Sequence, residues 1–278
     1  MLQTICIYNN KGGCGKTLAA VNLAAVYSYT YGRLYGKPYK TLLIDLDPQA
    51  NATHFLLRDP TTYSLTSADL FRQNPDTDIQ GVIYRSDLIE DLYVIPASPD
   101  LDDVEQELIT GRPAGNNEND RILLFARKLR KVADDYDMII IDTHPSKKRL
   151  LNLNALAAST LFICPCDSDP ESFEGLNGLM DTYHKISDIN PLLRFGGVLF
   201  TRFRNTNADI HALQVLSENL VNEKGEPLIY DNVIPLRAKQ VEARWVKIPP
   251  VLYAPSDEAT KAYIALADEI MRKSGKGR

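Results

Sequence analysis

A short glycine-rich segment near the start of the chain carries the side chains best suited to chemistry. It reads Lys11-Gly12-Gly13-Cys14-Gly15-Lys16-Thr17 and lies between an apolar run and a helical pattern. Glycines allow backbone N–H groups to surround phosphate oxygens, and the N-terminus of the following helix favours negative charge. The segment therefore predicts a phosphate-binding loop in which Lys16 contacts phosphate and Thr17 holds Mg²⁺. The general pattern begins with glycine where this chain has Asn10, so the loop is a variant.

Three aspartates follow two other apolar runs and are spaced to bind a metal ion and water. Asp45 and Asp47 lie two residues apart near the end of one run, and Asp142 ends the run that starts at Asp137. Residues two apart on a strand share one face, and ligands of open α/β sheets bind at the carboxyl ends of strands. We therefore expect Asp47 to position or activate water, and Asp45 and Asp142 to organise Mg²⁺.

The elements needed to position these groups alternate along the chain. Short apolar runs separated by helical spacing are typical of a mostly parallel, twisted α/β sheet flanked by helices on both faces. The expected strands are Ile5 to Tyr8, Thr41 to Leu46, Leu92 to Pro96, Met138 to Ile141, Leu161 to Pro165, Gly197 to Thr201 and Asn232 to Ile234. The expected helices are Lys16 to Tyr29, Arg121 to Ala133, Ser172 to Ile186, Ala208 to Asn222 and Asp257 to Arg272. Loops are expected at Tyr31 to Lys40 and Arg112 to Asn119, and a frayed polar tail at Lys273 to Arg278.

Composition limits the class of protein. The 278 residues include 44% hydrophobic residues, enough for one large domain, and we expect a single domain over residues 1–278. The formal net charge of -5 argues against a chain that coats nucleic acid through its overall charge. The four cysteines lie in or beside apolar runs or in the glycine loop, which indicates reduced thiols in the cytoplasm. A basic leader, a long apolar span and a region for a helix-turn-helix before the loop are all missing, so we expect neither export, membrane insertion nor operator-specific repression.

Together the three segments resemble the ParA/MinD family of deviant P-loop ATPases, most closely its ParA/Soj partition proteins. The family's loop has an additional lysine near its start, matched here by Lys11, and its D-x-D-P-Q motif is matched by Asp45 to Gln49. Similarity at Tyr136 to Pro145, Gly197 to Thr201 and Val233 to Pro235 extends the resemblance over nearly the whole chain.

The resemblance implies an ATP hydrolase that uses Mg²⁺, forms an ATP-dependent sandwich dimer and returns to the monomer after hydrolysis. Lys11 would reach the partner's phosphates, and Asp47 would be the hydrolytic residue. The implied catalytic set is Lys11, Lys16 and Asp47, and the implied metal ligands are Thr17, Asp45 and Asp142. The implied nucleotide-binding residues are Lys11, Gly12, Gly13, Cys14, Gly15, Lys16, Thr17, Leu18 and, at the adenine, Pro235. Leu18 departs from the family, in which many relatives have a second threonine.

Basic residues gather locally on this acidic chain. Such a face suits contacts to DNA phosphates without sequence readout, and the alternative is a solvated charged surface. The expected DNA-binding residues are Arg202, Arg204, Arg237, Lys239, Arg244 and Lys247. A second basic cluster, Lys147 to Arg149, lies close to the expected nucleotide site.

Three alternatives to a nucleoid-associated partition ATPase stay open. A MinD-like membrane-associated ATPase would end in an amphipathic helix with bulky apolar residues. An iron–sulfur or redox relative would use Cys164-Pro165-Cys166, and a nucleotide switch would bind ATP without turnover. The favoured role is to position a plasmid, a chromosome or a protein assembly through a ParB-like or other adaptor.

Overall fold

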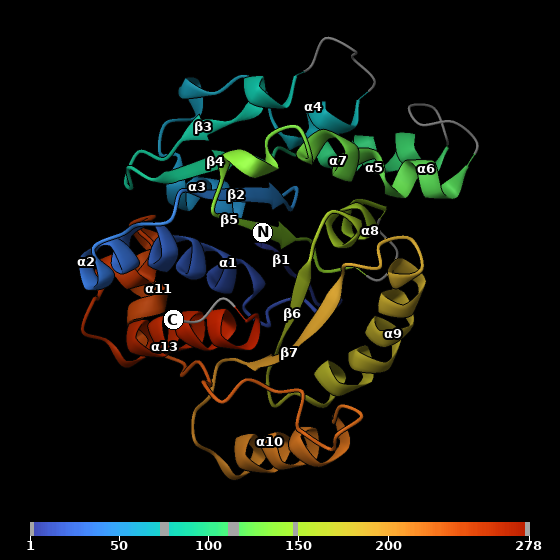
Figure 1. The fold of residues 1–278 in the computed structure, drawn as a ribbon. Helices are drawn as coiled ribbons and strands as arrows, with labels where there is room; N and C mark the ends of the chain where they lie inside the picture. The colour runs from blue at the N-terminus through green and yellow to red at the C-terminus, as the bar shows by residue number, and fades with distance from the viewer. Residues whose placement is uncertain (1–2, 73–77, 111–116, 147–149, 276–278) are drawn as a thin grey trace.

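A seven-stranded sheet organises the described part of the chain. The computed structural model describes residues 3–72, 78–110, 117–146 and 150–275. The strand order is β3-β4-β2-β5-β1-β6-β7, and β3 pairs antiparallel with β4 while the other pairs are parallel (Figure 1). The strands are β1 (Gln3–Ile7), β2 (Thr41–Leu46), β3 (Tyr84–Arg85), β4 (Leu92–Ile95), β5 (Met138–Thr143), β6 (Leu161–Cys166) and β7 (Arg194–Phe200). The expected mostly parallel sheet is confirmed.

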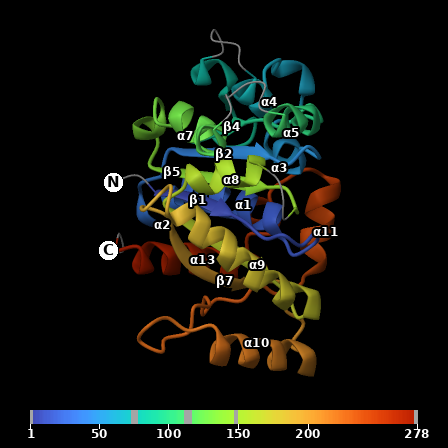
Figure 2. The same ribbon diagram turned by 90° about the vertical axis from the view of Figure 1, so that its right-hand side faces the viewer.

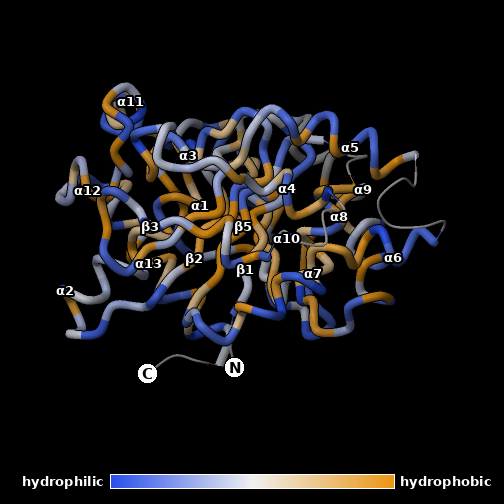
Figure 3. The backbone as a smooth tube through the Cα atoms, turned by 90° about the horizontal axis from the view of Figure 1, so that it is seen from above, coloured by the Kyte–Doolittle hydropathy of each residue, from blue (hydrophilic) through white to orange (hydrophobic). Residues whose placement is uncertain are grey.

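Helices cover both faces of this sheet because successive side chains of its strands enter two different cores. Ile5 and Ile7 of β1 pack with α1 (Lys16–Ala25) and α13 (Glu258–Lys273). Cys6 belongs to the opposite core, which includes residues of α8 (Leu150–Ala157) and α9 (Pro170–Ser187). Apolar residues accordingly gather around the central strands, as the hydropathy-coloured tube shows (Figure 3).

Most of the other helices are short. They comprise α2 (Tyr31–Tyr35), α3 (Asn51–Leu56), α4 (Ser67–Phe71), α5 (Leu101–Ile109), α6 (Glu118–Ile122), α7 (Leu124–Leu129), α10 (Asn207–Asn219), α11 (Ala238–Trp245) and α12 (Pro250–Tyr253). The sequence prediction contains α10 but lacks α3, α4, α5, α8, α11, α12 and the two-residue β3. Segments of so few residues complete too few turns to show a clear period.

The segment Tyr31 to Lys40, expected to be a loop, begins as a helix. A π-helical turn at Val26–Thr30 leads from α1 into α2, which ends at Gly36 with a left-handed φ of 73°. The Tyr31 ring packs edge-on against Tyr27 at 5.2 Å, and its hydroxyl donates to Asp268 Oδ1 at 2.5 Å. The contacts with the π-helical turn and with Asp268 of α13 stabilise a helix that the glycines and proline of the segment disfavour.

Three other expected elements differ in detail: a helix, a loop and the C-terminal tail. The predicted helix Arg121 to Ala133 is divided at Leu123 between α6 and α7, and Glu118 and Asn119 belong to α6 instead of a loop. Residues 112–116 of the expected loop Arg112 to Asn119 lie outside the described residues. Lys273, expected in the frayed tail, ends α13 and pairs with the Glu269 carboxylate at 2.7 Å.

The predicted strand Asn232 to Ile234 is also wrong, although this segment does run beside β7. Ile234 N donates to Phe200 O, and Phe203 N donates to Ile234 O, but the bridges there are isolated. Pro235 has no N–H to donate, so a continuous ladder cannot extend through it.

The parallel strands β1, β2, β5, β6 and β7 end at one edge of the sheet, opposite the end where the chain begins. Figures 2 and 3 place the described chain's two termini at one end of the molecule and α11 at the other. The loops at the carboxyl edge therefore bring together segments that are far apart in sequence.

Candidate functional site

The glycine-rich loop connects β1 to α1 at this carboxyl edge. Gly13 and Gly15 have φ values of 77° and 86°, a region that residues with a Cβ rarely adopt. Gly15 is also the N-cap of α1, so the loop delivers backbone N–H groups at a helix N-terminus. The Thr201 hydroxyl donates to Cys14 O at 2.8 Å and anchors the loop to the end of β7. The expected anion-binding geometry is therefore present.

Lys16 points into the loop. Its side chain is 6% exposed, and its Nζ donates to Lys11 O at 2.6 Å. A phosphate oxygen entering the loop can take over this ammonium, because a charge-assisted bond to an anion is stronger than one to a neutral carbonyl.

Two of the three aspartates lie side by side in the sheet. Asp45 and Asp142 are paired residues of β2 and β5, and both are fully buried. Asp45 accepts from Asp47 N at 3.0 Å and from Thr53 N and Oγ1 at 2.9 and 2.8 Å, so it also anchors α3. Burial, offset in part by these bonds, raises the pKa of Asp45 to about 6.

Asp142 is the carboxylate best suited to a cation. Both of its oxygens are buried without a well-formed hydrogen bond among the described residues, although Thr17 lies near enough to lower its pKa. Burial first, and then the charges of Asp45 and Asp47, raise the pKa of Asp142 well above its ordinary value. A divalent cation would remove this cost, and Mg²⁺ is commonly held by one or two carboxylates together with substrate phosphates. Asp142, the Thr17 hydroxyl and Asp45 fit such a site.

Asp47 lies beside this site with its carboxylate only partly used. The residue is 6% exposed, and its Oδ1 accepts from Gln49 N at 2.9 Å. Asp47 directly follows β2, two residues after the buried Asp45, so it stays the expected hydrolytic residue.

In the absence of nucleotide, the free energy of unfolding of the Asp142→Asn variant is expected to exceed that of the wild type by about 1–3 kcal/mol. The reason is that the variant no longer buries an uncompensated charge. The same change removes a cation ligand and should abolish Mg²⁺-dependent hydrolysis. The gain in stability should be largest near pH 8 and shrink as the pH falls through the raised pKa of Asp142, where the wild-type carboxylate becomes protonated. Urea unfolding at several pH values checks this. A destabilised variant that still hydrolyses ATP would contradict it.

Comparisons with known proteins show the family of this chain. A family model described as an AAA domain matches residues 2–195. The chromosome partitioning protein ParA of Myxococcus xanthus is 35% identical over 274 residues, which cover 98% of this chain and 88% of that protein. The sporulation initiation inhibitor protein Soj of Bacillus subtilis is 35% identical over 272 residues, which cover 97% of this chain and 98% of that protein. The chain belongs to the ParA/MinD family.

A solved structure also matches this ParA/MinD-family chain along its whole length. Cobyrinic acid a,c-diamide synthase of Mycobacterium smegmatis with bound ADP and magnesium has a TM-score of 0.78 and 25% identity. The match covers 100% of this chain and 97% of that chain. The P-loop fold inferred from the sequence is thereby confirmed.

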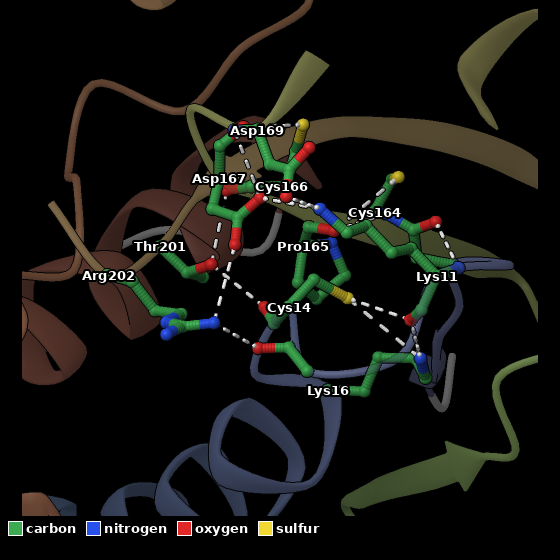
Figure 4. A network of polar contacts seen from close by, with 12 residues as sticks. Lys11, Cys14, Lys16, Cys164, Pro165, Cys166, Asp167, Asp169, Thr201 and Arg202 are labelled. Atoms are coloured by element: carbon green, nitrogen blue, oxygen red, sulfur yellow. Dashed lines mark hydrogen bonds and ion pairs between the residues drawn. The ribbon is translucent and has the colours of Figure 1, made fainter. Parts of the chain in front are cut away.

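The structure adds two acidic residues that the sequence reading did not include. Asp167 and Asp169 follow β6 and contact Lys11, the additional lysine of the ParA/MinD-type loop (Figure 4). A signal for them existed, because they repeat the pattern of Asp45 and Asp47: two carboxylates two residues apart after a buried strand.

The six expected DNA-binding residues do not share one environment in this ParA/MinD-family chain. Arg202 donates to Gly13 O at 3.1 Å, and with Arg204 it lines a hollow of about 200 Å³ beside Asp167. Two more of the six residues form ion pairs with acids. Arg237 contacts Asp257 and Glu258, and Lys239 contacts Glu242.

Arg244 and Lys247 are different. Both are exposed, neither has an ion pair among the described residues, and both line a hollow of about 260 Å³ that includes Thr17 and His54. Burial and the nearby charge of Lys247 lower the pKa of His54. Arg204 is likewise exposed without an ion pair among the described residues, but it lines a hollow with Asp167 and Asp169, whereas the hollow of Arg244 and Lys247 has no acid in its lining.

The remaining expected residues have less distinctive places. Leu18 packs partly buried against the core on the α1 side, and Pro235 is half-buried beside Phe203. The basic cluster at residues 147–149 lies outside the described residues. All four cysteines are buried and none forms a disulfide, and the described residues contain no group of His, Cys, Asp and Glu that could hold a metal by themselves.

Proposed function

We propose that this chain is a ParA-like ATPase that forms an ATP-dependent sandwich dimer, binds DNA without sequence preference and positions a cargo. The single observation that carries the proposal is the loop itself. It combines an inward Lys16 with a separate Lys11 whose ammonium is turned toward the β6 end at Asp169, 2.8 Å away. We propose that Lys16 serves the chain's own nucleotide and that Lys11, once released from Asp169, serves a partner's.

ATP and Mg²⁺ are the proposed ligands. The Mycobacterium smegmatis synthase structure holds ADP and magnesium, and the orphaned Asp142 beside Thr17 suits that cation here. The curated relatives include chromosome-partitioning ATPases, which supports hydrolysis. We further propose that turnover is slow in isolation, and that DNA and a ParB-like or other adaptor stimulate it in the cytoplasm, at the nucleoid.

Non-specific DNA binding is proposed to depend chiefly on Arg244 and Lys247. Phosphate contacts require cations that are exposed and not already neutralised, and these two residues meet both conditions. Their position beside Thr17 would let the nucleotide state influence them.

The test of this role uses the Asp47→Ala protein, in which bound ATP should persist without turnover. Binding to a random-sequence duplex is expected with ATP and Mg²⁺ but not with ADP, and log affinity should fall linearly with log salt concentration at a slope of about -0.9 per phosphate contact. Replacing both Arg244 and Lys247 with alanine should reduce the slope by about 2. As a control, Arg85→Ala removes an arginine of β3 that is paired with Glu90, and it should leave DNA binding unchanged. Equal binding with ADP and ATP would refute the nucleotide dependence.

The chain's single tryptophan provides an independent readout of the same event. Trp245 is 86% exposed at the end of α11, between Arg244 and the nearby Lys247. DNA seated on those two cations should therefore change Trp245 emission in an ATP-dependent and salt-sensitive manner. An affinity that rises with ATP while the emission stays constant would place the DNA elsewhere.

The membrane-associated alternative is less well supported. Helix α13 directs Tyr263, Leu266 and Ile270 into the core, so its main apolar face is already covered. No helix among the described residues is long and apolar enough to span a bilayer. If DNA fails to bind in both nucleotide states, vesicles of anionic lipid become the next ligand to test.

A further inference from the structure

Lys11 is held within its own chain by two carboxylates (Figure 4). Its Nζ lies 2.8 Å from Asp169 Oδ2 and 3.5 Å from Asp167 Oδ1. The Lys11 side chain is 18% exposed and that of Asp167 12%, so this pair is partly shielded from water, whereas the side chain of Asp169 is 49% exposed. The shielding of Lys11 and Asp167 should strengthen the contact relative to a fully exposed surface ion pair.

The fold fixes Asp167 between two cations. Asp167 follows the last residue of β6, and the whole residue is 9% exposed. Its Oδ2 lies 3.5 Å from Arg202 Nη1, the same nitrogen that donates to Gly13 O in the phosphate loop. Arg202 has a left-handed φ of 57°, which is uncommon for a residue with a Cβ, so the end of β7 adopts a strained conformation where it meets the loop.

The charges around Lys11 favour its protonated, paired form. Burial alone would lower its pKa, but the carboxylates of Asp169 and Asp167 outweigh burial and raise it. The ammonium is therefore more tightly held here than it would be in water.

The backbone of Lys11 links this contact to the nucleotide. Lys11 O accepts from Lys16 Nζ at 2.6 Å, so both lysines of the loop are satisfied internally when phosphate is not bound. When bound phosphate draws the Lys16 ammonium away from Lys11 O, one restraint on Lys11 is removed. The phosphates of the nucleotide on a second copy of the chain can then compete with Asp167 and Asp169 for the Lys11 ammonium.

We propose that Asp167 and Asp169 are positioning residues that hold Lys11 in cis in the monomer, so that dimerisation requires an exchange of its ion pair from these carboxylates to the partner's phosphates. This rests on the in-trans role of Lys11 in the proposed function. The strength of the two contacts then sets the monomer–dimer equilibrium, and weakening them favours the dimer.

The first experiment measures the contact in the nucleotide-free protein, where no dimer is needed. The rate at which an N-hydroxysuccinimide ester acetylates Lys11, followed by peptide mass, reports how free its amine is. Asp169→Asn should raise this rate about three- to tenfold, since a lower pKa and a released side chain both favour reaction. Asp169→Glu, which keeps the charge, should restore slow labelling. Glu118→Gln removes the pairing partner of Lys185, 2.7 Å away, and should speed labelling of Lys185 while Lys11 stays slow.

The second experiment measures the dimer. In the Asp47→Ala background with ATP and Mg²⁺, sedimentation over a concentration series should show that Asp169→Asn tightens the dimer dissociation constant about three- to tenfold. Glu118→Gln should leave that constant unchanged.

The outcomes separate this proposal from the function on which it rests. Unchanged Lys11 labelling in Asp169→Asn overturns the restraint, and faster labelling with an unchanged or weaker dimer overturns its regulatory role. Faster labelling in a protein that never dimerises with ATP supports the restraint itself and instead overturns the sandwich dimer.

Discussion

Replacing Lys11 with alanine is expected to lower the rate of ATP hydrolysis about 10³- to 10⁵-fold, the range known for cationic groups supplied in trans to a transferring phosphoryl group. ATP affinity should be largely kept. The reason lies in the loop, where the Lys11 ammonium is turned toward Asp169 while Lys16 occupies the interior. Phosphate release and calorimetric ATP binding measure the two effects separately. Unchanged turnover would reject this role for Lys11.

Mixing two inactive variants tests whether Lys11 acts on the partner. A subunit with Lys11→Ala keeps Asp47, and a subunit with Asp47→Ala keeps Lys11. In a mixed dimer, the site of the first subunit has its own Asp47 and receives Lys11 from the second, so hydrolysis should return at one site in two. If Lys11 served its own site, both sites would stay inactive, and the mixture would be no faster than either variant alone.

Lys16→Ala is expected to weaken ATP binding by at least about 100-fold, because it removes charge-assisted bonds worth roughly 3 kcal/mol to the phosphates. Lys16 is 6% exposed, and its ammonium already lies inside the loop. The other lysine of the loop, Lys11, is paired with Asp167 and Asp169 and does not occupy the position of Lys16. Calorimetry with ATP and Mg²⁺ gives the affinity directly.

A second lysine serves as the control for whether the loss of ATP affinity is specific to the phosphate loop. Lys261→Ala changes an exposed residue of α13 and should bind ATP like the wild type. Circular dichroism of both variants confirms that each is folded. Micromolar ATP affinity in a folded Lys16→Ala protein would contradict the assignment of the phosphate loop.

Much of the architecture could be predicted from local patterns. Buried parallel strands read as continuous apolar runs, so β2, β5 and β6 were visible in the sequence. Where tertiary contacts override local preference, prediction failed. The α2 helix forms in a segment with glycines and a proline because Tyr31 bonds to Asp268 of α13, 237 residues away along the chain, which no local pattern reveals.

Some residues of the candidate site could also be predicted from the sequence, and others could not. Lys16, Thr17, Asp45, Asp47 and Asp142 could be named from the sequence because each follows an apolar run in a pattern with a direct chemical reason. The expected basic DNA face could not be resolved, because charge neutralisation depends on neighbours. Only the fold shows that Arg237 lies against Asp257 and Glu258, whereas Arg244 and Lys247 have no such acids among the described residues.

By itself the sequence determined the class of fold and the chemistry of the phosphate loop. A glycine-rich turn between a strand and a helix can be built from adjacent residues, and Lys16 and Thr17 are positioned by that turn alone. Tertiary structure alone decided what Lys11 contacts, since Asp167 lies 156 residues away along the chain. The two meet because β1 and β6 are neighbours in the sheet, and only strand order, which arises from packing of the whole chain, brings their carboxyl ends together.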